Sequence, residues 1–216
     1  REDWSQLSKN AVKYMQEIGR QYPNCGYGGH FFYWIFSDDP QPYGSYGNGS
    51  AMRISAVGFA ADSIEQAKTL SQAVTEVSHD HPEGLKGAEA VAVAIFLART
   101  GSSRHEIKDY IDKNYYPMDF TLDQIREDYS FDVTCQGSVP QAFQAFFESQ
   151  DFEDAIRNAI SIGGDSDTIA AICGGLAEAY YGIPAPIRNQ AMAYLDDHLV
   201  EIVDTFESTY PIHPNK

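Results

Sequence analysis

The stretch GGDSDTIAAICGGLAEAYYG, residues 163–182, is a glycine turn followed by an alanine-rich segment of helical length. Two glycines at its start permit a sharp turn, and alanine has the highest helix propensity of the amino acids. Glycine inside a helix costs about 1 kcal/mol relative to alanine, so the pair at 174–175 predicts the close approach of a neighbouring backbone. The stretch therefore predicts a buried, rigid helix over 166–181.

The rest of the chain also has helical patterns. Apolar residues recur at helical spacing from Leu7 to Ile18, and Pro23 ends that segment. Residues 24–50 are rich in glycine and aromatic residues, which predicts turns around one short apolar helix. With no hairpin signal and no internal repeat, the sequence predicts an all-α fold, a compact multi-helix bundle. Further helices are expected at 50–60, from 63 onward, and at 82–101, 104–114, 121–127, 139–148, 151–161 and 186–207.

The composition restricts the class of protein. The chain has 216 residues, of which 43% are hydrophobic, enough to bury a core in one domain. Fifteen Lys and Arg against 31 Asp and Glu give a formal charge of −16, which disfavours nucleic acid and anionic membranes as partners. No apolar run approaches the ~20 residues that cross a bilayer, and no signal-peptide pattern is present. Three cysteines without a CxxC pair indicate reduced thiols, so we expect a cytoplasmic protein.

Two aspartates and a threonine crowd the start of the predicted helix. Asp165, Asp167 and Thr168 each carry a side-chain oxygen, and an Asp at this position is an ordinary N-cap. One cap needs one Asp, however, and two carboxylates held close repel unless a cation or a proton lies between them. Oxygen donors suit Mg²⁺, Ca²⁺ or Mn²⁺ and not zinc. The residues by themselves leave capping and metal binding equally open.

Three stretches together resemble one protein family. GGDSDTIAAICGGLAEAYYG at 163–182, GSYGNGSAMR at 44–53 and VSHDHPEGLKGAEAVAVAI at 77–95 are similar, in the family's order, to the motifs of ADP-ribosylglycohydrolases. This family includes the dinitrogenase-reductase-activating glycohydrolase. The resemblance implies an all-α orthogonal bundle, which agrees with the helical pattern.

The resemblance also implies a function. Family members hydrolyse the glycosidic bond between ADP-ribose and a modified protein side chain or small conjugate, using two Mg²⁺ ions, or Mn²⁺ in some members. It implies metal ligation by Asp165, Asp167 and Thr168, with Asp165 and Asp167 as catalytic residues. The implied partner is an ADP-ribosylated protein or an ADP-ribose conjugate. Substrate binding is implied for Gly44, Ser45, Tyr46, Asn48 and His79, and for Tyr27 and Gly28.

The sequence departs from the family near its N-terminus. Members have an N-terminal segment with a Thr-Asp-Asp-Thr motif that supplies the other half of the metal site, and nothing before residue 26 resembles it. Ser37-Asp38-Asp39-Pro40 is interpreted as a solvated turn. We therefore expect a single domain, residues 1–216, that lacks this segment and has little activity alone. The alternatives are a catalytically impaired member that binds ADP-ribose or a partner protein, and a structural domain with an acidic helix cap.

Three side chains near these motifs have more ordinary interpretations. Arg53 lies in an apolar segment, where it could bind a carboxylate or a phosphate or form a buried ion pair. His81 is interpreted as structural, in contrast to His79. Cys135 has no evident base beside it, so we interpret it as a buried thiol and not a nucleophile.

Overall fold

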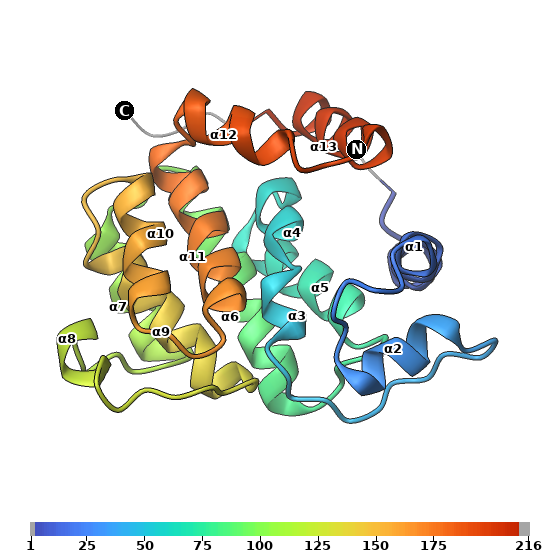
Figure 1. The fold of residues 1–216 in the computed structure, drawn as a ribbon, viewed down its shortest axis with the longest axis horizontal. Helices are drawn as coiled ribbons and strands as arrows, with labels where there is room; N and C mark the ends of the chain where they lie inside the picture. Colours follow the sequence, from blue (N-terminus) through green and yellow to red (C-terminus); the bar gives the residue numbers. More distant parts are fainter. Residues whose placement is uncertain (1–2, 212–216) are drawn as a thin grey trace.

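The computed structural model describes residues 3–211 and has thirteen helices in that range (Figure 1). The first are α1 (Leu7–Gln21), α2 (Gly29–Phe36), α3 (Gly49–Met52), α4 (Ser55–Ala60) and α5 (Ile64–Thr75). Then follow α6 (Pro82–Arg99), α7 (Arg104–Asn114), α8 (Leu122–Ile125) and α9 (Cys135–Phe147). The last are α10 (Phe152–Ser161), α11 (Ser166–Tyr181), α12 (Ala185–Met192) and α13 (Asp197–Thr209). The described residues form no strand, so the predicted all-α class is confirmed.

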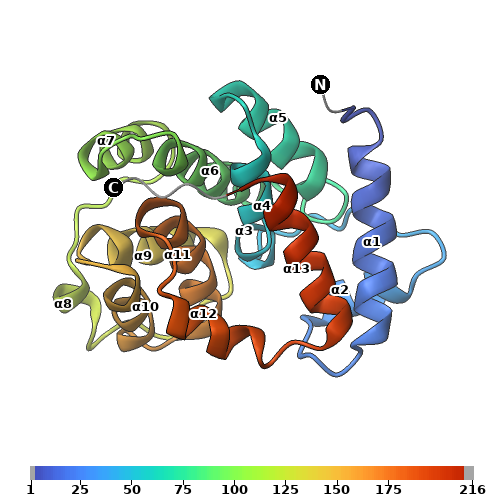
Figure 2. The same cartoon turned by 90° about the horizontal axis from the view of Figure 1, so that it is seen from above.

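Helix α6 is the centre of the fold. Ten of its residues are buried, and they are distributed around the whole helix. Helices α4 and α5 pack on it, and so do α9 and α11 (Figure 2). A helix that is apolar on all sides belongs in the interior of a bundle, which explains why alternating Ala and Val form no strand here. The helix predicted at 82–101 is confirmed, with Pro82 in its first turn.

Helix α11 has the bounds that the sequence predicts. It packs against α6, α9 and α10, and most of its apolar residues are buried. A methyl group on Gly175 would collide with Ser55 Oγ of α4, and one on Gly174 would lie 3.1 Å from Ile156 Cδ1 of α10. The two glycines therefore leave room for side chains of neighbouring helices, whereas the sequence predicted the close approach of a neighbouring backbone.

Two of the predicted helices are each divided in the structure. The segment 50–60 forms α3 and α4, because the chain leaves helical geometry at Arg53. The segment 186–207 forms α12 and α13, because Asp196 caps a new helix by accepting the Leu199 N–H at 3.0 Å. An interruption as short as one turn leaves the apolar periodicity on both sides unchanged. The sequence pattern therefore predicted one helix where the structure has two.

The other predicted helices are present, with ends shifted by a few residues. Helix α9 differs most, because it begins at Cys135 and not at 139. Thr134 is the reason: its hydroxyl accepts the Gly137 N–H at 3.0 Å and so caps the helix early. Cys135 is fully buried, as predicted.

The two edges of the molecule in Figure 1 differ in their packing. Helices α12 and α13 lie along the upper edge and contain no buried residue. The α10–α11 turn and the loops before α3 and α9 lie along the lower edge. Within the described range, no helix has both the length and the apolar character that crossing a bilayer requires. The single-domain prediction includes residues 1–2 and 212–216, which lie outside the described residues.

Candidate metal and ligand site

The turn between α10 and α11 carries the predicted metal ligands. Gly163 and Gly164 have φ angles of 72° and 66°, a left-handed backbone that glycine adopts without strain. Asp165 follows at the N-cap of α11, but its side chain accepts no capping hydrogen bond. The capping interpretation is therefore wrong for Asp165. Asp167 lies exposed in the first turn, and Thr168 is buried.

Asn48 connects this turn to the glycine loop that precedes α3. Its Nδ2 donates to Asp165 Oδ2 at 2.7 Å and to Ser138 Oγ at 2.9 Å. Its backbone N–H donates to the Val133 carbonyl at 2.7 Å. Asn48 is 6% exposed, so its donors are engaged inside the protein. Because Asn48 is held from several sides, it fixes the orientation of the Asp165 carboxylate.

The surroundings of Asp165 favour its protonated form. Burial raises the pKa of the Asp165 carboxyl, and the neighbouring Asp167 raises it further. The hydrogen bonds from Asn48 and Thr168 oppose that rise. A cation bound between the two carboxylates would remove their repulsion in the way that a proton does.

The three side chains offer oxygen donors of the kind that hard cations bind. Asp165, Asp167 and Thr168 lie within one turn of the same helix, and Thr168 Oγ1 lies 3.6 Å from Met52 Sδ, a weak acceptor, in addition to its bond to Asp165. Across residues 3–211, no three His, Cys, Asp or Glu side chains gather in a way that could hold a metal ion. Mg²⁺ requires octahedral coordination and usually keeps several waters. The donors present therefore fit part of the coordination shell of Mg²⁺.

The glycine loop is shaped by hydrogen bonds of its own. The Gly44 N–H donates to Asp80 Oδ1 at 2.7 Å, and the Gly47 N–H donates to Ser45 Oγ at 3.1 Å. These two donors are engaged within the protein, so a diphosphate would have to use other groups of the loop. The loop rests on the first turn of α6 at Gly84, where a methyl group would lie 2.5 Å from the Ser45 carbonyl oxygen. No sequence pattern singled out Gly84.

His79, which the resemblance assigns to substrate binding, lies behind this loop. It is 4% exposed. Methyl groups on Gly47 and Gly49 would lie 3.8 and 3.5 Å from His79 Nε2, so this nitrogen faces the loop. Burial lowers the pKa of His79 to about 3, and the charge of Arg53 lowers it as well. His79 is therefore a neutral side chain at physiological pH.

The neighbouring His81 has a structural role, as predicted. Its Nδ1 accepts the Glu83 N–H at 3.1 Å and caps α6. The ring of Tyr46 packs against His81 with 5.1 Å between the ring centroids, and Tyr46 is 46% exposed. Of the predicted binding residues in the loop, Tyr46 thus presents its side chain to solvent.

Tyr27 and Gly28 lie at the start of α2, on the flank of this group. The Tyr27 ring is 5.9 Å from the ring of Phe31, which in turn is 6.4 Å from His79. Gly28 precedes α2, and its carbonyl accepts the Phe32 N–H at 2.9 Å. Neither residue is in contact with the acidic turn, and their binding role stays a prediction.

A segment that the sequence did not identify joins the two halves of the site. We call residues 129–135 the strap. Near one end Thr134 pairs with Gly47 in an isolated antiparallel bridge. At the other end the Tyr129 ring fills the space that a side chain on Gly164 would need. The strap carries no motif, and its only local signal is the helix cap at Thr134.

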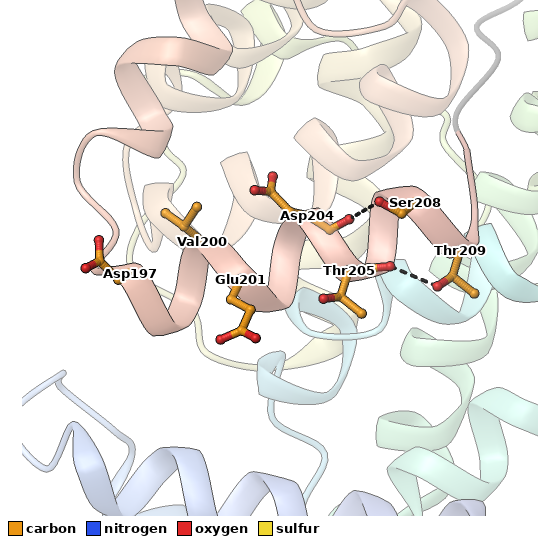
Figure 3. Close-up of a pocket in the computed structure, with 7 residues that line it drawn as sticks. All are labelled: Asp197, Val200, Glu201, Asp204, Thr205, Ser208 and Thr209. Atoms are coloured by element: carbon orange, nitrogen blue, oxygen red, sulfur yellow. Dashed lines mark hydrogen bonds between the residues drawn. The ribbon is translucent and has the colours of Figure 1, made fainter.

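Two surface hollows lie away from these residues. The first, of about 640 Å³, lies beside α13 and is lined by Asp197, Val200, Glu201, Asp204, Thr205, Ser208 and Thr209 (Figure 3). The Ser208 and Thr209 hydroxyls donate to backbone carbonyls of their own helix. The second, of about 770 Å³, is lined mainly by residues of α4, α5, α6 and α13 and by the segment that follows α13. Neither hollow includes a predicted site residue.

These features define a helical protein in which one asparagine joins a glycine loop to a pair of helix-borne carboxylates. The family model described as ADP-ribosylglycohydrolase matches residues 5–211. The chain belongs to this family, as its motifs predicted. A solved structure titled "ADP-ribosylglycohydrolase-related protein complex" is similar in fold, with a TM-score of 0.64 and 22% identity over 87% of this chain and 71% of that one.

Several curated proteins are similar in sequence. ADP-ribosylhydrolase ARH3 of Homo sapiens is 26% identical over 186 residues, which cover 65% of this chain and 51% of that protein. An uncharacterized protein of Archaeoglobus fulgidus is 32% identical over 150 residues, 61% of this chain and 48% of that protein. ADP-ribosylarginine hydrolase Tri1 of Pseudomonas putida is 27% identical over 162 residues, 69% and 42% of the two chains. The chain spans about half the length of these relatives.

Proposed function

We propose that this protein is a metal-dependent hydrolase that cleaves the glycosidic bond between ADP-ribose and a modified protein side chain or small conjugate. The main support is the Asp165 carboxylate, which leaves the helix backbone uncapped and is held by Asn48 of the glycine loop. The names of two relatives, an ADP-ribosylhydrolase and an ADP-ribosylarginine hydrolase, support the class of substrate. The partner is accordingly an ADP-ribosylated protein or an ADP-ribose conjugate.

We assign Asp165, Asp167 and Thr168 to the binding of Mg²⁺, with two ions in the family and Mn²⁺ as a substitute. When bound, the metal would orient the distal ribose and activate a water for attack at its anomeric carbon. The two carboxylates are the catalytic residues in this proposal, because they hold the positive charge at the reacting end of the ligand. Ordinary glycosidases differ, since they use one carboxyl group as acid and another as base or nucleophile.

The remaining predicted residues belong to ligand binding in this proposal. Gly44, Ser45, Tyr46 and Asn48 shape the loop that receives the diphosphate and distal ribose, and the exposed ring of Tyr46 provides a contact surface. His79 supplies a neutral donor behind the loop. A protein with a formal charge of −16 needs neutral donors or cations to hold a diphosphate.

A second candidate function is binding of ADP-ribose or a partner protein without turnover. The observation that favours it is the small set of acidic donors: within residues 3–211 no three His, Cys, Asp or Glu side chains gather for a metal ion. An incomplete coordination shell would weaken catalysis before it abolished ligand binding. The predicted cytoplasmic location does not distinguish the two candidates and stays a prediction.

Two measurements on the chain separate these candidates. Calorimetric titration with Mg²⁺ and with ADP-ribose tests binding, and release of ADP-ribose from a modified protein tests turnover. Asp167→Asn should weaken Mg²⁺ binding, whereas the matched variant Asp154→Asn, in the first turn of α10, should leave it unchanged. Release that depends on Mg²⁺ supports the hydrolase, and binding without release supports the second candidate. If the chain bound neither Mg²⁺ nor ADP-ribose, both would be wrong.

A further inference from the structure

Arg53 is a largely enclosed cation that has no acidic partner among residues 3–211. Its Nε has no solvent contact and no hydrogen bond, and its Nη2 contacts only Ser78 and His79. Over residues 3–211, no carboxylate forms an ion pair with Arg53. The buried ion pair that the sequence left open is therefore not formed among these residues. Enclosing an unpaired charge is costly. The enclosed position of Arg53 therefore indicates a role other than an ion pair.

The hydrogen bonds of Arg53 determine where His79 carries its proton. Arg53 Nη2 donates to Ser78 Oγ at 2.7 Å and lies 3.4 Å from His79 Nδ1. The Ser78 hydroxyl lies 2.9 Å from the same nitrogen. A guanidinium is only a donor, so the Ser78 oxygen accepts from Arg53, which leaves the Ser78 proton available to His79 Nδ1. Arg53 Nη2 faces the same nitrogen, and a protonated Nδ1 would set two donors against each other. This arrangement favours an unprotonated Nδ1 and a neutral imidazole with its N–H at Nε2.

The neighbouring rings hold the imidazole in this orientation. The Tyr43 ring is 5.5 Å from that of His79, and Phe31 lies against both His79 and the guanidinium, 6.4 Å and 5.1 Å away. Rotation of the His79 ring would break these contacts together with the bond from Ser78. His79 is therefore fixed in position as well as in tautomer.

The charged and titratable groups around His79 do not favour a second proton. Arg53 repels it, and burial raises the pKa of Tyr43, so that Tyr43 is neutral. The Asp80 carboxylate, next in the sequence, accepts the Gly44 N–H instead. Burial also raises the pKa of Cys135, which interacts electrostatically with Arg53, to about 11. No anion is thus bonded to the imidazole, and His79 stays a neutral donor.

We propose that Arg53, acting through Ser78, is a positioning residue that fixes His79 as the neutral Nε2–H tautomer, so that His79 donates to an anionic oxygen of the ligand at Gly47–Gly49. Methyl groups on these glycines would lie 3.8 and 3.5 Å from Nε2, which places the donor against the loop. The identity of the ligand, a diphosphate ester, rests on the proposed function. The tautomer of His79 does not, because it follows from hydrogen bonds within the protein.

The tautomer can be measured directly on the unliganded chain. Long-range ¹H–¹⁵N spectra of the imidazoles between pH 5 and 8 should show one His79 species, protonated at Nε2 and unprotonated at Nδ1. Ser78→Ala should introduce the other tautomer or a charged form within this range, and Ser78→Thr should restore the wild-type spectrum. Ser71→Ala is the matched control, since Ser71 is equally buried but its hydroxyl has no hydrogen-bond partner. A wild-type His79 protonated at Nδ1 would overturn the proposal, whatever the variants do.

Binding of ADP-ribose then tests the consequence for the ligand. Ser78→Ala should weaken binding about tenfold, the effect of one hydrogen bond, and make it depend on pH, whereas Ser71→Ala should do neither. If the wild-type chain binds no ADP-ribose, the proposed function fails and the spectra still decide the tautomer. If it binds and Ser78→Ala changes neither the tautomer nor the affinity, the positioning role fails while the proposed function stands.

Discussion

The two ends of α11 both carry a carboxyl group whose pKa burial raises, yet their surroundings differ. At the N-terminal end, Asp165 receives a hydrogen bond from Asn48 at 2.7 Å and lies at the positive end of the helix dipole. At the C-terminal end, the Glu178 carboxylate receives no hydrogen bond among the described residues and lies at the negative end of the dipole. Burial, together with the charge of Glu207, raises the pKa of Glu178 to about 7.

The difference shows what converts a buried carboxyl group into a candidate site. Asp165 is supplied with donors by segments far away in the sequence, whereas the cation nearest Glu178 is already engaged. Arg188 Nη2 lies 2.5 Å from Glu207 Oε2 and binds that residue of α13. Glu178 therefore lowers its desolvation cost by taking up a proton, whereas the proposed function has Asp165 share a cation. Four substitutions test this contrast.

The largest expected effect is on metal binding at the N-terminal end. Asp165→Ala should reduce the affinity for Mg²⁺ well over 100-fold, more than about 3 kcal/mol, because a direct ligand is lost and not a residue that merely supports one. Calorimetric titration measures it, with Glu178→Ala as the comparison at the other end of the helix. A similar loss for both variants would mean that the two ends do not differ in this way.

The next effect concerns the stability of the fold at the C-terminal end. Because the folded-state pKa of Glu178 lies above its ordinary value of 4.5, the folded state holds the proton more tightly and loses stability as the pH rises from 4.5 through about 7. Glu178→Gln removes this loss and should stabilise the protein by about 3 kcal/mol at pH 8, with little change near pH 4.5. Urea unfolding at both pH values measures it. Glu201→Gln, on the exposed side of α13, is the control, and an equal gain at both pH values would contradict the interpretation.

The third substitution removes the donor that distinguishes Asp165 from Glu178. Asn48→Ala should lower Mg²⁺ affinity 10–100-fold, the usual cost of losing a residue that orients a metal ligand. Asp165 would then resemble Glu178 at the other end of α11, because it would lack the donor from Asn48. Titration with Mg²⁺ measures it, and Asn158→Ala, whose amide donates to the Ala145 carbonyl, is the control. An unchanged affinity would show that Asn48 does not orient the ligand.

The smallest expected effect is on the stability of the fold. It is tested by comparing two aspartates that each occupy the N-cap position of a helix. Asp151 caps α10 by accepting the Asp154 N–H at 2.9 Å, whereas Asp165 makes no such bond at the start of α11. Asp151→Ala should therefore cost about 1 kcal/mol of stability in urea unfolding. Asp165→Ala should cost less, because it removes no cap and relieves the repulsion with Asp167, which offsets the loss of the bond from Asn48. The reverse order of the two costs would restore the capping interpretation of Asp165.

Much of the fold could be predicted because its signals are local. The bounds of α11 follow from the turn at Gly163 and Gly164 and from the alanine content of the helix. Residues 90–98 of α6 are all apolar, which indicated a buried helix there, and the structure shows that it is the central one. The errors are also local in origin: at Arg53 and at Asp196 a single turn interrupts an apolar pattern that continues on both sides.

The residues of the candidate site could be predicted from the sequence, but the contacts between them could not. The motifs identified Asp165, Asn48 and His79, and the structure places Asn48 against Asp165 and His79 behind the glycine loop. The strap at 129–135 and Gly84 escaped notice, because neither has a pattern of its own. They matter because of their contacts with residues distant in the sequence, and those contacts form only when the whole chain is folded.

The sequence by itself determined the helices, the acidic character and the family, since these depend on periodicity, composition and motifs within a few tens of residues. Only the tertiary structure decided whether the Asp165 carboxylate accepts a hydrogen bond from the backbone of its own helix or from a distant segment. The reason is physical: a cap needs a donor three residues away, whereas Asp165 is bonded to an amide 117 positions distant. The same holds for Arg53: no sequence pattern could reveal that it has no acidic partner among residues 3–211.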